Sequence, residues 1–151
     1  MSIHAFWDND EQTIIRFLYR RGNWEWHDFY AALEEARTLV ESVERRQVGF
    51  IIDITYGSLT PGIFMSQTKV LHEFRQHPAV SLVIVIGADR FIEALYQIST
   101  ANVPLHDQYY FARTLDDAYI ILEEVNNLPR PMSDEPIPLD DWMTLPATRT
   151  G

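Results

Sequence analysis

The most informative part of the sequence is residues 50–62, which read Phe-Ile-Ile-Asp-Ile-Thr-Tyr-Gly-Ser-Leu-Thr-Pro-Gly. An apolar, β-branched run closes at Asp53, and a polar loop then leads to a helix-like sequence that begins near Pro61. A nearly continuous apolar run of this length is typical of a strand buried on both faces. In an open α/β sheet, ligands and partners usually bind at the loop after such a strand. The segment therefore predicts a central strand and the working surface beside it.

Strand-like and helix-like segments alternate along the chain. We expect strands at Ile3–Asp8, Gln12–Tyr19, Val48–Ile54, Ser81–Ile86 and Tyr109–Phe111, and helices at about 26–43, 60–76, 88–102 and 114–125. We summarise this order as ββαβαβα, with a short last strand. It predicts an α/β fold: a mainly parallel sheet with an antiparallel N-terminal hairpin and helices packed on it. The strands at 48–54 and 81–86 should be neighbours and parallel.

Apolar residues at three- and four-residue steps predict which face each helix buries. The inward positions expected for the first three helices are Phe29, Leu33, Ala36, Val40 and Val43, then Ile63, Gln67, Val70, Leu71 and Phe74, then Phe91, Leu95 and Ile98. For the last helix we expect Leu115, Ala118, Leu122 and Val125. Thr60, ahead of Pro61, is the expected N-cap of the second helix. Thr114 is expected to cap the last.

Composition narrows the classes of partner. The chain has 151 residues and a formal net charge of −10, which disfavours binding to nucleic acid or to anionic membranes. The pairs Arg20-Arg21 and Arg45-Arg46 are isolated rather than part of a basic stripe. No apolar run is long enough to span a bilayer, the N-terminus does not resemble a signal peptide, and there is no cysteine. We expect a cytoplasmic protein.

The sequence changes character at residue 127. Five of the eight prolines lie beyond this point, so neither helix nor strand can extend far. We therefore expect one domain over residues 1–126 and a proline-rich tail over 127–151. The tail nevertheless carries Ile137, Leu139, Trp142, Met143 and Leu145, which a disordered segment normally lacks. We expect it to dock on its own domain or on a second copy, in which case a homodimer is favoured.

The hairpin, the helix and then Ile52-Asp53-Ile54 before a polar loop and a second helix resemble the STAS-like domains, the anti-sigma-factor-antagonist fold. The resemblance is greatest to the SpoIIAA-like branch and covers residues 1–126. It implies a non-enzymatic domain that binds a protein, nucleotide or lipid at the loop before the second helix. Regulated members carry Asp-Ser-Ser-Gly with a phosphorylated serine, whereas this chain reads Leu59-Thr60-Pro61-Gly62. We expect no phosphoswitch here.

The candidate binding residues all lie between the strand end and the second helix. Asp53 is either a ligand-binding acid or a carboxylate that organises the following turn by accepting backbone N–H groups. Tyr56 and Ser58 are the better candidates for direct contacts, since Thr60 already has a role as a helix cap. Gly62 stands near the position that the resemblance gives to the acceptor serine.

The sequence gives little support for a metal site, a cofactor site or a catalytic centre. The histidines, His4, His27, His72, His77 and His106, do not have the spacing of metal ligands, and we predict no metal site. Glycines occur singly, so phosphate-binding loops and a Gly-x-Ser-x-Gly elbow are missing. We predict no cofactor and no catalytic residues.

Two functional interpretations remain open. The first is a non-catalytic binding or regulatory module that contacts another protein, or itself, at the loop 55–62. The alternative is a carrier or sensor of a small apolar or lipid-like ligand, which an aromatic-lined void of several hundred cubic ångströms would favour. Trp24, Trp26 and Tyr30 either wall such a pocket or pack the first helix onto the sheet.

Overall fold

The computed structural model describes residues 2–43, 47–103 and 109–127. The elements are β1 (Ile3–Trp7), β2 (Ile14–Tyr19), α1 (Trp26–Glu41), β3 (Val48–Asp53), α2 (Pro61–Arg75), β4 (Val80–Ile86), α3 (Arg90–Ser99), β5 (Tyr110–Ala112) and α4 (Leu115–Asn127). The order is therefore ββαβαβαβα. All nine segments expected from the sequence are present, including the strand at 109–111 and the helix at 114–125, which are β5 and α4. The summary ββαβαβα is wrong because it leaves out this last strand–helix pair.

The five strands form one mixed sheet in the order β1-β2-β3-β4-β5. β1 and β2 are antiparallel, and the pairs β2–β3, β3–β4 and β4–β5 are parallel. The prediction of a mainly parallel sheet with an antiparallel N-terminal hairpin is confirmed. So is the prediction that the two apolar segments at 48–54 and 81–86 are parallel neighbours.

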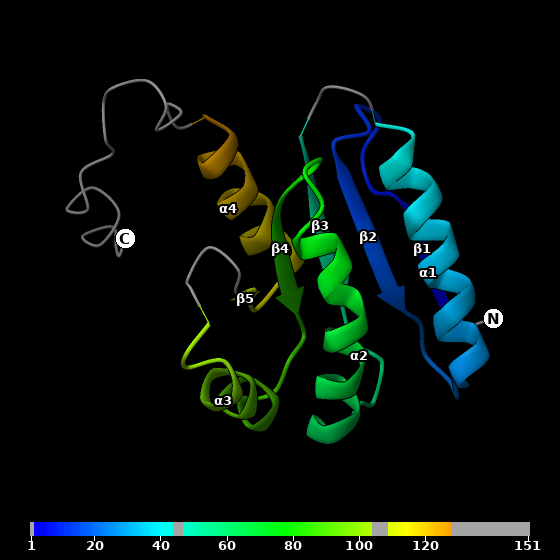
Figure 1. Cartoon of the computed structure of the whole chain (residues 1–151), viewed down its shortest axis with the longest axis vertical. Helices are drawn as coiled ribbons and strands as arrows, with labels where there is room; N and C mark the ends of the chain where they lie inside the picture. The colour runs from blue at the N-terminus through cyan, green and yellow to red at the C-terminus, as the bar shows by residue number, and fades with distance from the viewer. Residues whose placement is uncertain (1, 44–46, 104–108, 128–151) are drawn as a thin grey trace. The chain divides into compact units, whose positions relative to one another are not determined.

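One face of the sheet is covered by α1 and α2, which lie in front of the strands in Figure 1. The predicted stripe of α1 is confirmed, since Phe29, Leu33, Ala36, Val40 and Val43 are all buried. Aromatic side chains form the centre of this core. The Phe50 ring stacks on Phe74 with centroids 4.8 Å apart and lies 6.2 Å from the Phe17 ring. Such pairs stabilise a fold by about 0.5–1.5 kcal/mol beyond the area they bury.

The opposite face is also buried at its centre. Ile51, Ile84 and Ile86 point away from α1 and α2, and each is at most 2% exposed. All six residues of β3 are buried, as its apolar sequence predicts. Two charged side chains, Arg16 and Asp53, interrupt this apolar face, and they organise the candidate site described below.

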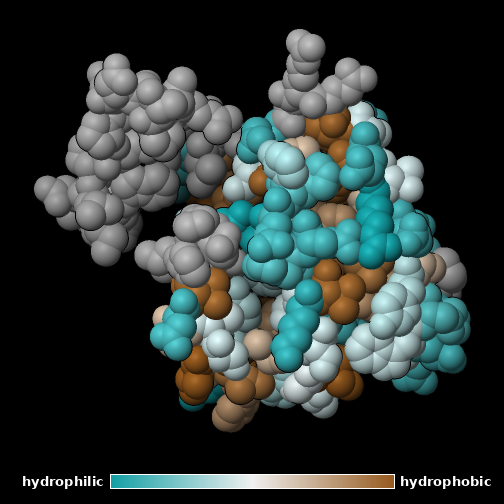
Figure 2. Space-filling view, in the orientation of Figure 1, coloured by the Kyte–Doolittle hydropathy of each residue, from teal (hydrophilic) through white to brown (hydrophobic). Residues whose placement is uncertain are grey.

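The predicted inward face of α3 is wrong. Phe91 is 69% exposed and Ile98 is 75% exposed, whereas Ile92 and Tyr96 are buried. Apolar side chains gather on the surface over α3 at the lower end of Figure 2. The helix phase is set by the Tyr96 ring, which stacks on Tyr109 with centroids 5.5 Å apart. This pairing lies 13 positions apart in the sequence, so helical periodicity alone does not reveal it.

The inward face of α2 is partly as predicted. Gln67, Leu71 and Phe74 are buried, but Ile63 and Val70 are only half-buried. Phe64 and Thr68 are buried in their place. The buried face of α2 is therefore rotated about the helix axis by about one residue from the face that the sequence predicts.

Gly87 holds the end of β4 close to the loop after β3. Its φ of +87° is unfavourable for other residues, and a Cβ atom there would lie 2.4 Å from Thr55 Cα. The Ile54 amide donates to the Ile86 carbonyl at 3.0 Å just before this contact. The loop that begins at Thr55 is thus anchored directly against the neighbouring strand.

The chain divides into two compact units, residues 1–119 and 120–151, and the first contains the whole sheet. Residues 128–151 lie outside the described residues, so the docking of the tail stays a prediction, as does the domain boundary at 126. Within the described ranges, no helix is both long and apolar enough to cross a membrane.

Candidate functional site

Asp53 organises the turn that follows β3. Its Oδ1 atom accepts hydrogen bonds from the Thr55 amide at 3.1 Å and from the Thr55 hydroxyl at 2.7 Å. The Asp53 side chain is only 7% exposed. Of the two interpretations of this residue, the contacts match the turn-organising one. They also hold its second oxygen, Oδ2, toward β2.

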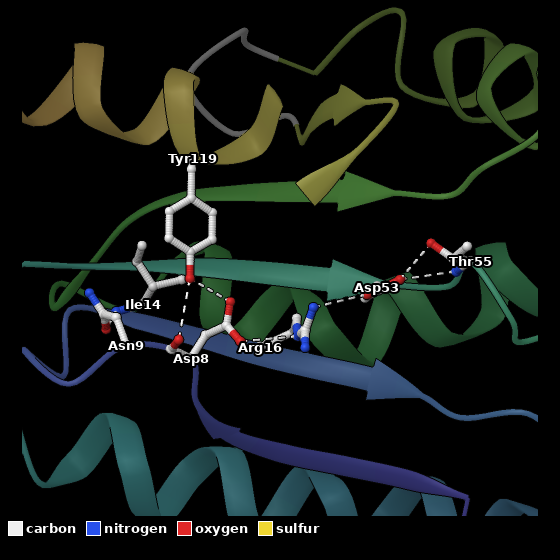
Figure 3. A network of polar contacts seen from close by, with 7 residues as sticks. All are labelled: Asp8, Asn9, Ile14, Arg16, Asp53, Thr55 and Tyr119. Atoms are coloured by element: carbon white, nitrogen blue, oxygen red, sulfur yellow. Dashed lines mark hydrogen bonds and ion pairs between the residues drawn. The ribbon is translucent and has the colours of Figure 1, made fainter. Parts of the chain in front are cut away.

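Arg16 of β2 lies between two aspartates on the same face of the sheet (Figure 3). Its Nη1 atom lies 3.5 Å from Asp53 Oδ2, and its Nε atom lies 3.3 Å from Asp8 Oδ1. The Arg16 guanidinium also lies 5.4 Å from the Phe6 ring centroid. The Arg16 side chain is 21% exposed and both carboxylates are buried more deeply. The two negative charges offset the charge of Arg16 and fix its position.

Tyr119 of α4 completes this chain of polar contacts. Figure 3 shows its hydroxyl pointing toward Asp8, where it donates to Oδ2 at 2.6 Å. Burial, followed by the hydrogen bond to Asp8, raises the pKa of the Tyr119 hydroxyl above its usual range. The hydroxyl therefore stays protonated at neutral pH and remains a donor to the aspartate.

The other predicted contact residues take separate positions along the loop. The Thr60 hydroxyl accepts a hydrogen bond from the Ile63 amide at 3.2 Å, so Thr60 is the N-cap of α2 as predicted. Ser58 is exposed and has a φ of +51°. Gly62 is exposed in the first turn of α2. Tyr56 is 47% exposed and is the residue of the loop that faces a hollow.

This hollow lies at the carboxyl ends of β2 and β3 and has a volume of about 440 Å³. It is lined by Arg16, Leu18, Arg20, Arg21, Asp53 and Tyr56. The Arg21 guanidinium lies 4.3 Å from the Tyr56 ring centroid, which joins the loop after β2 to the loop after β3. The structure therefore brings Asp53 and Tyr56 to one site and leaves Ser58, Thr60 and Gly62 outside its lining.

Sequence reasoning missed the arginines of this site. Apolar Ile15, Phe17 and Tyr19 alternate along β2 with Ile14, Arg16 and Leu18, so Arg16 lies on the face of mixed polarity. Parallel pairing of β2 with β3 places Arg16 diagonally from Asp53. In the sequence, Arg20 and Arg21 form an isolated basic pair, which argues against nucleic-acid binding and does not by itself indicate a site. Their position directly after a strand parallel to β3 is the signal that identifies them.

The aromatic cluster at the start of α1 packs the helix and continues to the surface. Trp24 lies edge-on to Tyr19, and Trp26 lies edge-on to both Trp24 and Phe29. Trp26 remains 42% exposed and Tyr30 remains 53% exposed. A Cβ atom on Gly57 would lie 3.0 Å from Tyr19 Cβ, so the loop after β3 meets this cluster at Tyr19.

A second hollow, of about 300 Å³, lies against α2 and α3. Met65, Val103, Tyr96 and Tyr109 make its wall largely apolar in area, and its polar groups come from Thr68, Lys69, His72, Ser99 and Thr100. Tyr96 and Tyr109 form part of its wall, and burial raises the pKa of both hydroxyls. The Tyr96 hydroxyl accepts from the Tyr109 amide at 2.8 Å, and the Tyr109 hydroxyl donates to the Thr68 carbonyl at 3.1 Å.

Across the part of the chain that the structure describes, no group of three His, Asp or Glu side chains is arranged to hold a metal ion. Comparisons with protein-family models, with curated proteins and with solved structures found no match to this chain. The resemblance to the STAS-like family therefore stays a prediction, and the functional argument rests on the site itself.

Proposed function

We propose that this chain is a non-catalytic, STAS-like binding or regulatory module that works through protein–protein contact at the strand-end loop 55–62 and the neighbouring loop after β2. The cytoplasmic location expected from the sequence is part of this proposal. The partner is a different protein or a second copy of the chain.

The observation that carries the proposal is the cation–π contact of Arg21 with Tyr56, in which the Arg21 Cζ atom lies over the ring, 4.3 Å from its centroid. It unites the loops after β2 and β3 into one surface at the carboxyl ends of parallel strands, where α/β folds usually bind their partners. Trp26 and Tyr30 are exposed on the helix that follows the first of these loops. Trp, Tyr and Arg are the residues most enriched at the energetic centres of protein interfaces.

The rigidity of the surface supports the same function. Gly87 packs against Thr55, Asp53 binds the turn, and Thr60 caps the following helix. A loop held in this way loses little conformational entropy when it binds, so more of the contact energy remains as affinity.

Photo-crosslinking in the native host tests the proposal. We would place p-benzoylphenylalanine at Tyr56 or at Trp26, with Gln97 on the exposed side of α3 as the control position. We expect covalent adducts of defined mass from the first two positions and none from Gln97. An adduct of twice the chain mass identifies self-association. Equal adduct formation at all three positions, or none at any, would refute the proposed surface.

The hollow against α2 and α3 favours a second candidate function, the carrier or sensor of a small apolar ligand. Its volume of about 300 Å³ and its wall of Tyr96 and Tyr109 fit the lower end of the size range of ligand pockets. Native mass spectrometry of the purified protein tests this function. A retained small molecule that is lost in Thr100→Trp, which fills the hollow, supports it. A mass equal to that of the bare chain refutes it.

A further inference from the structure

The hollow at the ends of β2 and β3 concentrates positive charge on an acidic protein. The chain as a whole has 12 Lys and Arg against 22 Asp and Glu. The lining of the hollow has three arginines, Arg16, Arg20 and Arg21, against one carboxylate, that of Asp53. This local excess is opposite in sign to the net charge and needs a physical explanation.

Arg16 does not supply the free positive charge of the hollow. Its guanidinium lies within 3.5 Å of Asp53 and within 3.3 Å of Asp8, so its charge is offset by the two carboxylates. Arg20 and Arg21 differ from it. Both are exposed, and within residues 2–43, 47–103 and 109–127 no carboxylate oxygen lies within 4.0 Å of either guanidinium.

The cation–π contact of Arg21 with Tyr56 holds a donor group in place. A guanidinium held over the face of an aromatic ring makes no hydrogen bond to it, so its N–H groups remain available as donors. Two such N–H groups match the two oxygens of a carboxylate or a phosphate. Because the Tyr56 ring holds the guanidinium in place beforehand, less side-chain entropy is lost when an anion binds.

We propose that this hollow binds a single compact oxyanion, a carboxylate or phosphate group, through the guanidinium groups of Arg20 and Arg21, with Arg16 held behind them by Asp8 and Asp53. The inference deepens the proposed function and rests on it for the location: it names the chemical group that a partner presents to the loops after β2 and β3. The group comes from an acidic side chain of the partner or from a free small anion.

The charge distribution restricts the ligand to a small anion. Electrostatic interactions are screened over about 8–10 Å at physiological salt, so Arg20 and Arg21 attract a group that reaches them closely. A polyanion that extends beyond the hollow meets the field of a protein with a net charge of −10. A volume of about 440 Å³ holds one such group with the atoms that carry it.

Titration of the ¹⁵N-labelled full chain in Tris buffer, with ionic strength held constant by sodium chloride, tests the inference. The probes are sodium phosphate and sodium glutarate in separate titrations. We expect saturable shifts in the amide signals of residues 16–21 and 53–57 with at least one probe. The double variant Arg20→Gln/Arg21→Gln should bind that probe at least tenfold more weakly. Arg90→Gln, at the exposed start of α3, should bind it as the parent protein does.

Each outcome bears on one source of the oxyanion or on the inference itself. Saturation by glutarate alone supports a carboxylate from a partner, saturation by phosphate alone supports a phosphate group, and saturation by both supports the shared chemistry. Shifts that do not saturate, or that are equal in the double variant, overturn the oxyanion site. The Tyr56 crosslink separates the two proposals. If the crosslink persists in the double variant, the contact surface stands without the oxyanion site. If anions bind but no crosslink forms, the oxyanion site stands without the contact surface.

Discussion

Asp53 and Arg16 meet across two parallel strands, with Asp53 Oδ2 3.5 Å from Arg16 Nη1. The partner directly opposite Asp53 is Leu18, so Arg16 lies diagonally, two residues earlier on the same face of β2. This ion pair links the turn after β3 to Asp8 near the opposite end of the sheet, and through Asp8 to Tyr119. The geometry of the candidate site therefore depends on a largely buried ionic network.

Loss of Arg16 should destabilise the protein. Arg16→Met leaves two buried carboxylates without their cation, and breaking a fully buried pair costs about 3–5 kcal/mol. Because the Arg16 side chain is 21% exposed, we expect a smaller loss in the free energy of unfolding, measured by urea denaturation. A double-mutant cycle with Asp53→Asn should give a coupling of about 0.5–3 kcal/mol. Strictly additive effects of the two substitutions would contradict the pair.

Gly87→Ala should be strongly destabilising. The substitution places a Cβ atom 2.4 Å from Thr55 Cα and forces a non-glycine residue to a φ of +87°. The backbone strain alone costs about 1–3 kcal/mol, and the clash should also displace the loop after β3. Urea denaturation measures the loss of stability, and the amide signals of residues 54–60 report the displacement.

Gly62→Ala is the matched control for Gly87→Ala. A Cβ atom at Gly62 meets nothing within 4 Å, and the residue lies in the first turn of α2. We expect unchanged or slightly higher stability, by about 0.4–1 kcal/mol. Equal losses for the two glycine variants would contradict the close approach of Gly87 to Thr55.

Thr60→Ala should lower stability without changing the oxyanion site. The hydroxyl caps α2 by accepting from the Ile63 amide, and loss of such a cap costs about 0.5–2 kcal/mol. Thr60→Ser keeps the oxygen and should retain most of the stability. Thermal unfolding and the phosphate and glutarate titrations measure the two effects separately. A loss of anion affinity in Thr60→Ala that Thr60→Ser restores would show instead that the threonine hydroxyl contacts the ligand.

Acid should destabilise the protein in part through Asp28. A hydrogen bond from the Glu25 amide lowers the pKa of the Asp28 carboxyl below its ordinary value of 3.8. A carboxyl whose pKa is lower in the folded state contributes stability above pH 3.8, and that contribution is lost as the pH falls through the folded-state pKa. Urea denaturation at pH 6 and at pH 3 should therefore show a smaller pH-dependent loss for Asp28→Asn than for the parent. Equal losses would exclude this contribution.

The fold was largely predictable because its strands are strongly apolar and two of its helix N-caps are threonines that can be recognised in the sequence. The run Val48–Asp53 is buried throughout, and Thr60 and Thr114 each accept from an amide of the first helical turn as predicted. The phase of α3 was not predictable, since it depends on the stacking of Tyr96 on Tyr109. Periodicity places residues on a helix face, but it does not identify which face meets a distant ring.

The site was predictable only in part, for a related reason. Asp53 and Tyr56 follow one strand in sequence and could be found by reading along the chain. Arg16, Arg20 and Arg21 belong to a different strand and its loop, and they reach the site through the parallel register of β2 with β3. That register is a property of the sheet rather than of either segment, so the cationic half of the hollow emerges only in three dimensions.

The contrast between a cationic hollow and a net charge of −10 has a consequence for encounter kinetics. An anionic partner is repelled by the whole molecule at long range and attracted only after it has come close to Arg20 and Arg21. Added salt weakens the long-range repulsion more than the short contact, because screening grows with distance. The association rate of such a partner should therefore increase with ionic strength, whereas oppositely charged proteins usually associate more slowly as salt is added.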